Sequence, residues 1–110
     1  MKEFNVSREK DDKDLFIQKE KEFFIYDSLA DKNLHIDCIM GAFSCVKAMF
    51  NVSVKQLPKD VEDDIRLDLA NIGKKYRDLV PGGERDNWDF FAELQNDVNL
   101  VYAKLKEALK

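Results

Sequence analysis

Apolar residues recur along the chain with the three-to-four-residue spacing of amphipathic helices. The clearest case is the segment 34–51, where two apolar rows lie side by side, as is typical of the most buried helix of a bundle. The two rows comprise Ile36, Ile39, Phe43, Val46 and Phe50, and Cys38, Ala42, Cys45 and Met49. Comparable single stripes run through three further segments, so the pattern predicts helices over about 12–31, 34–51, 58–80 and 86–109.

The segments between these stripes carry the residues that end and begin helices. Pro58 is suited to the first position of the third helix, and Pro81 followed by two glycines predicts its end. Connections of a few residues favour antiparallel neighbours. The sequence therefore predicts an all-α fold, a single-domain antiparallel four-helix bundle over 1–110. Residues 1–10 are expected to form a short polar arm, either a frayed terminus or a minimal strand.

Composition agrees with one soluble domain. The 110 residues are 45% hydrophobic and 36% charged, and the formal net charge is −4. This hydrophobic fraction is too high for a disordered chain. The chain begins without an apolar signal core, and no stretch reaches the roughly 18 uncharged apolar residues of a spanning helix. The two cysteines suggest no disulfide framework. These features predict a cytoplasmic protein that does not enter a membrane.

The sequence offers little for catalysis. Cys38 and Cys45 lie among apolar residues rather than in the electropositive setting of a reactive thiol, and His35 is the single histidine. We therefore expect no catalytic residues, metal or cofactor. One enzyme class stays open as an alternative: Mg²⁺-dependent all-α nucleotide pyrophosphohydrolases, which place acidic pairs on two inward helix faces. The nearest acidic residues here are Glu20, Glu22, Asp60, Asp63 and Asp64, without that family's Glu-Glu-x-x-Glu spacing.

Two acidic rows are the most distinctive polar feature. Each row repeats every fourth residue and so lies on one helix face: Asp60, Asp64 and Asp68 in the third helix, and Asp89, Glu93 and Asp97 in the fourth. Like charges at this spacing cost about 0.2–0.5 kcal/mol per pair in an isolated helix. Either nearby lysines and arginines offset this cost, or the rows meet a partner with a basic surface. In the second case Trp88 and Phe90 would be apolar anchors.

Two further groups of residues could contact another helix or a nucleic acid. The small residues Gly41, Ser44 and Ala48 would let another helix approach closely, within the bundle or across a homodimer. Nucleic-acid binding stays open as an alternative, either through a basic cluster or through acidic rows that mimic DNA, although the acidic net charge makes nucleic acid an improbable partner. That basic cluster would comprise Lys74, Lys75, Arg77, Lys104, Lys106 and Lys110.

Taken together, these patterns favour a small non-enzymatic protein–protein interaction module, such as an inhibitor, an immunity protein or an accessory subunit. It would bind a protein partner through its acidic and aromatic helical face. On this view, reversing the charges of Asp64, Asp68 and Glu93 should weaken partner binding and leave folding intact.

Overall fold

The computed structural model describes the backbone of residues 2–32, 36–82 and 88–110, and the side chains of 11–32, 36–77 and 90–110. Its helices are α1 (Lys2–Lys32), α2 (Ile36–Ser53), α3 (Lys59–Gly82) and α4 (Trp88–Ala108), with a short 3₁₀ turn, η1 (Val54–Gln56), between α2 and α3. The described residues contain no strand. The predicted all-α four-helix fold is confirmed.

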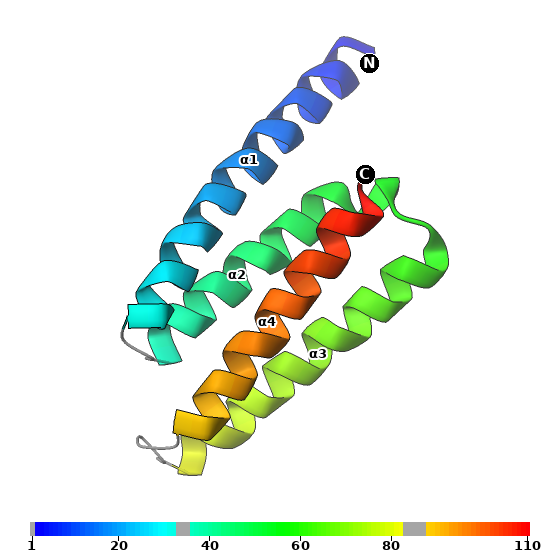
Figure 1. Cartoon of the computed structure of the whole chain (residues 1–110). Coiled ribbons are helices and arrows are strands. Elements are labelled where there is room, and N and C mark those ends of the chain that lie inside the picture. Colours follow the sequence, from blue (N-terminus) through cyan, green and yellow to red (C-terminus); the bar gives the residue numbers. More distant parts are fainter. Residues whose placement is uncertain (1, 33–35, 83–87) are drawn as a thin grey trace.

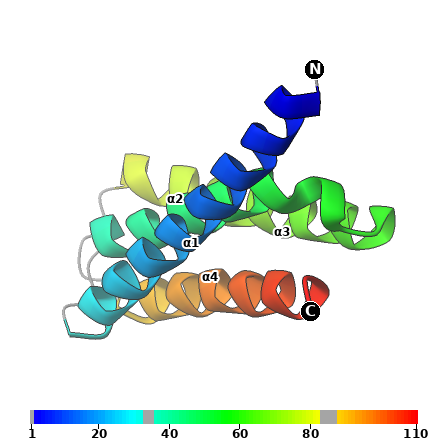
Figure 2. The ribbon, with the colours of Figure 1, turned by 90° about the horizontal axis from the view of Figure 1, so that it is seen from above.

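The helices follow one another in alternating directions, as Figure 1 shows. In that view α2 and α4 occupy the middle, α1 lies on one side of them and α3 on the other. Seen from above, α1 is inclined to its neighbours and its first turns extend past them (Figure 2). The Cα radius of gyration, 15.2 Å, accordingly exceeds the roughly 13 Å expected of a compact domain of this length.

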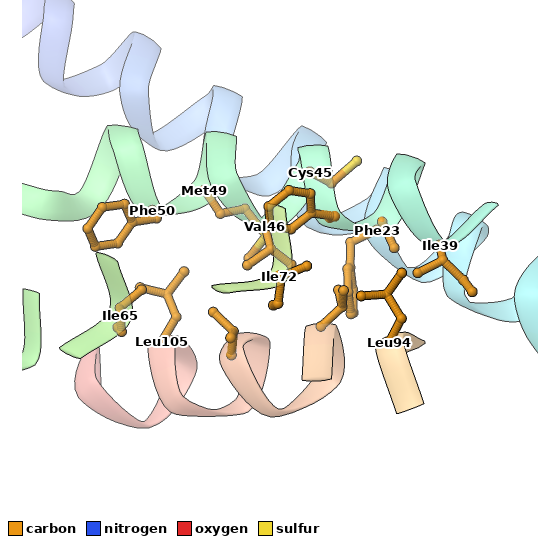
Figure 3. Close-up of a cluster of buried hydrophobic side chains, with 14 of the residues drawn as sticks. Phe23, Ile39, Cys45, Val46, Met49, Phe50, Ile65, Ile72, Leu94 and Leu105 are labelled. Atoms are coloured by element: carbon orange, nitrogen blue, oxygen red, sulfur yellow. The ribbon is translucent and has the colours of Figure 1, made fainter. Parts of the chain in front are cut away.

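The core is formed by the predicted stripes and is drawn in Figure 3. All four helices contribute side chains with at most 2% of their surface exposed, and α2 contributes the most. The largest of these are Phe23, Ile39, Val46, Met49, Phe50, Ile65, Leu94, Val98 and Leu105. Because α2 is apolar over most of its circumference, it can contact both α1 and α4, which explains its place in the middle of the bundle.

The predicted N-terminal arm over 1–10 was wrong, because α1 begins at Lys2 and is continuous through to Lys32. The physical reason is local: residues 2–10 contain no Gly or Pro and include several good helix formers, so nothing interrupts the helix. The other boundaries differ little from expectation, with α3 extending to Gly82. Residue 86, the predicted start of the fourth helix, lies outside the described residues.

One segment is more membrane-like than the sequence analysis allowed. Residues Ile36–Gln56 are long and apolar enough to cross a membrane by length and composition, with a mean hydropathy of 1.2. In the bundle, however, the exposed positions of α2 are polar, namely Asp37, Ser44, Lys47 and Asn51. Apolar residues buried inside and polar residues outside are the distribution of a core helix.

The close contact between α1 and α2 depends on a glycine. A Cβ atom added to Gly41 would lie 2.6 Å from ring carbons of Tyr26, nearer than side chains approach one another. The small residue predicted to admit another helix therefore does so within the bundle. Of its two companions, Ser44 is exposed and Ala48 is half-buried.

Candidate interaction surface

Each acidic row faces a lysine of the neighbouring helix, and the two rows lie toward opposite ends of the α3–α4 pair (Figure 1). Lys104 Nζ of α4 donates to Asp64 Oδ2 at 2.8 Å and to Asp68 Oδ2 at 2.6 Å in α3. In the opposite direction, Lys75 Nζ of α3 donates to Asp97 Oδ2 at 2.7 Å and to Glu93 Oε1 at 3.2 Å in α4. Each lysine thus holds two carboxylates of the neighbouring helix and relieves their mutual repulsion.

Both lysines are stabilised in their charged form. Hydrogen bonding to Asp97, and secondarily to Glu93, raises the pKa of Lys75 despite its partial desolvation. Hydrogen bonding to Asp64 and Asp68 raises the pKa of Lys104 in the same way. The two ion-pair groups therefore remain intact well above neutral pH. Most of these side chains are more than a quarter exposed, so solvent and salt screen them.

The remaining acidic and aromatic candidates are distributed differently. Asp60 is exposed near the start of α3. Phe90 is half-buried and packs against the core rather than standing free as an anchor. The side chains of Trp88 and Asp89 lie outside the described residues. Four of the six acidic candidates form two separate pairs: Asp64 and Asp68 on Lys104, and Glu93 and Asp97 on Lys75.

A groove of about 590 Å³ lies between α3 and α4, between the two ion-pair groups. Its apolar lining includes Ile72, Val101 and Leu100, and Lys75 and Lys104 also line it. Leu100 is 58% exposed and Leu67, on α3, is 60% exposed. These two leucines were missed by the sequence analysis because they lie off the helical stripes. Their position could have identified them, because each is a large apolar residue at a place where the helical spacing predicts exposure to solvent.

The acidic residues of the enzyme hypothesis are not brought together. Tyr102 Oη donates to Glu20 Oε2 at 2.6 Å, and Lys106 Nζ lies 2.8 Å from the same oxygen. Asp60, Asp63 and Asp64 belong to α3, on the other side of the bundle from α1 (Figure 1). Among the described side chains, no group of three or more His, Cys, Asp or Glu residues could hold a metal ion.

The basic residues considered for nucleic-acid binding do not form one uninterrupted basic patch. Lys75 and Lys104 bind the acidic rows, Lys106 pairs with Glu20, and Lys110 Nζ lies 3.0 Å from Glu107 Oε2. Lys74 and Arg77 are exposed on α3. Most of the proposed cluster is therefore next to carboxylates, which would oppose the approach of phosphates.

Comparison with known proteins identifies no relative. No protein-family model matches the chain, and neither a curated protein nor a solved structure resembles it significantly.

Proposed function

We propose that this protein is a small non-enzymatic interaction module, such as an inhibitor, an immunity protein or an accessory subunit, and that it binds its protein partner through the α3–α4 face. The observation that carries this proposal is the groove between the two helices, with Leu100 on its lining and Leu67 exposed on the same pair of helices. An exposed leucine that lines a concave surface is a common feature of protein-binding sites.

The charges around the groove indicate the kind of partner. Each lysine is shared by two carboxylates, so each of the two ion-pair groups keeps an excess negative charge. Asp60 adds exposed negative charge on α3, whereas exposed Asp63 is paired with Lys59 at 3.2 Å. Lys74 adds one cation to the lining of the groove. A partner that places an apolar ridge in the groove and basic side chains along its edges would be complementary to this surface.

The bridging lysines change how this surface must be tested. Reversing Asp64 or Asp68 would place a new cation beside Lys104, so the variant would lose contacts between α3 and α4 as well as surface charge. The charge reversals suggested by the sequence alone would therefore confuse stability with binding. Substitutions of the exposed leucines avoid this difficulty, because neither side chain is part of the buried core.

The test is an affinity pull-down from the source cell with mass-spectrometric identification of the captured protein. The double variant Leu67→Ser, Leu100→Ser should lose a partner that the unaltered protein captures, with an unchanged circular dichroism spectrum. The matched control is Leu29→Ser, which replaces an exposed leucine of α1, 41% accessible, and should retain the partner. Equal capture by the double variant and the unaltered protein would rule out the α3–α4 face.

A further inference from the structure

Helix α1 exposes large apolar side chains, among polar ones, in addition to the apolar stripe that it buries. Phe16, Phe23, Tyr26 and Ala30 point into the bundle. Five of the seven large exposed apolar side chains in the described part of the protein also belong to α1: Leu15, Ile17, Phe24, Ile25 and Leu29, with 37–59% of their surface exposed. Large apolar side chains that gather on one exposed part of a protein are typical of an interaction site. The bundle covers one side of α1.

Between residues 11 and 32, the outer face of α1 is accessible. Figures 1 and 2 place α1 at the edge of the molecule, with its first turns extending past the other helices. With 31 residues against the 21 of α4, α1 is longer by about 15 Å at 1.5 Å per residue. A second helix could therefore lie along α1 without contacting the α3–α4 face.

The charges on this outer face are arranged for a particular orientation. Asp14 and Lys32 are both exposed and are 18 residues apart, which is about five turns, so they project in the same direction from opposite ends of the face. An identical helix that runs antiparallel would place Asp14 beside Lys32 of the second copy, and Lys32 beside its Asp14. A parallel copy would oppose like charges at both ends.

The same arrangement brings the apolar residues together. The two-fold axis that pairs Asp14 with Lys32 passes close to residue 23, so Phe24 and Ile25 lie within two residues of it. Each would meet its counterpart in the second copy, as an isologous interface requires. Lys21 lies on this face as well, and its long stem can cover apolar surface while its ammonium reaches water at the edge.

We propose that the protein forms a two-fold symmetric homodimer in which the outer faces of α1 pack antiparallel. Phe24 and Ile25 form the centre of this interface, and Asp14 and Lys32 form its two ends. A single pair of helices is at the small end of specific interfaces, so the dimer should dissociate on dilution. This dimer leaves the α3–α4 face open, and it stands or falls independently of the function proposed above.

Sedimentation equilibrium of the full chain from about 1 µM to 1 mM tests the proposal. The mass should rise with concentration from 12.8 kDa toward twice that value. Ile25→Lys should abolish the rise, because it places a charge at the centre of the interface. The matched control is Leu67→Lys on α3, since Ile25 is 59% and Leu67 is 60% exposed. The control should dimerise as the unaltered protein does.

A charge exchange tests the antiparallel orientation. Asp14→Lys should weaken association at least severalfold, because the new lysine opposes Lys32 of the second copy. Adding Lys32→Asp in the same chain should restore association, since the two ends are then complementary again. A monomer at every concentration, or a dimer unaffected by Ile25→Lys, would overturn the proposal. Loss of the dimer in Leu67→Lys would also overturn it and assign self-association to the α3–α4 face.

Discussion

The two sides of helix α4 are joined to their neighbours by different means. Toward α1, the ring of Tyr102 stacks on Phe23 with centroids 4.4 Å apart, and its hydroxyl donates to Glu20. The amides of Gln95 and Asn99 also donate to Asp27. Toward α3, the polar contacts are the lysine-bridged carboxylates at the edge of the groove. On the α1 side, α4 is held by a close ring stack and by hydrogen bonds of defined geometry. On the α3 side, it is held by buried apolar contacts and by ion pairs that solvent screens.

This difference indicates which side of the bundle can change without loss of the fold. A stacked aromatic pair and a glycine contact tolerate little adjustment, because close packing makes even small volume changes felt. Ion pairs at an exposed edge contribute little each and can be rearranged. A binding surface is therefore easier to accommodate on the α3 side, where the groove lies. Four pairs of measurements would test this contrast.

The largest expected effect is at Phe23, which is 1% exposed and stacked on Tyr102. Phe23→Ala should lower the free energy of unfolding by about 3–5 kcal/mol, because it removes buried contacts and leaves a cavity. Its neighbour Phe24 is 50% exposed and meets Tyr102 only at the ring edge, so Phe24→Ala should cost about 1 kcal/mol. Urea unfolding of the two variants measures the difference. Equal costs would mean that α1 is not fixed by this stack.

The two helical glycines should respond in opposite directions. Gly41→Ala should lower the free energy of unfolding by about 1–3 kcal/mol, since the new methyl group would meet the Tyr26 ring. Nothing lies within 4 Å of a Cβ built at Gly73 in α3, so Gly73→Ala should gain about 0.5–1 kcal/mol from helix propensity. Thermal unfolding gives the sign of each change. A stabilising Gly41→Ala would show that α1 and α2 do not approach as closely as described.

Tyr102→Phe tests the directional bonding on the α1 side. The variant keeps the stack on Phe23 and loses the hydrogen bond to Glu20, at a cost of about 1.5 kcal/mol near neutral pH. Burial acts to raise the pKa of Glu20, but the bonds from Lys106 and Tyr102 outweigh it and hold the pKa below its usual 4.5.

The pH dependence of this effect follows from that direction. Because the pKa of Glu20 is lower in the folded state, its stabilising contribution is present above the unfolded-state pKa and is lost as the pH falls through the folded-state value. The difference between the unaltered protein and Tyr102→Phe should therefore shrink below about pH 4.5. Denaturant unfolding at pH 7 and pH 3 checks this. A difference that stays constant would assign the cost to packing rather than to the carboxylate.

The smallest effect is expected on the α3 side. Lys104→Met should cost about 0–1 kcal/mol at low salt, because the partly exposed pairs with Asp64 and Asp68 are screened by solvent. In 1 M NaCl, where the screening length is about 3 Å, the cost should nearly vanish. The Tyr102→Phe cost should change less with salt. Equal salt dependence of the two variants would remove the proposed contrast between the two sides of α4.

Much of the fold could be predicted from the sequence, because helical phase is a local property. The stripe of Val61, Ile65, Leu69 and Ile72 fixes which side of α3 faces inward, wherever its neighbours lie. The arm over 1–10 was wrong because a polar segment that lacks helix breakers can continue a helix without an apolar stripe of its own. Gly41 was correctly singled out as a close-contact position, but whether its partner helix was internal depended on Tyr26.

The sequence by itself determined the four helices, their inward stripes and the two acidic rows. Only the tertiary structure decided that Lys104 meets Asp64 and Asp68, 40 and 36 residues away, and that Lys75 meets Asp97, 22 residues away. It also decided that Leu67 and Leu100 remain uncovered and that five large apolar side chains of α1 remain exposed. The reason is geometric: sequence spacing sets the angle of a side chain around its own helix. The rotation and axial shift of one helix against another, which decide which charges meet, depend on how all four stripes pack together.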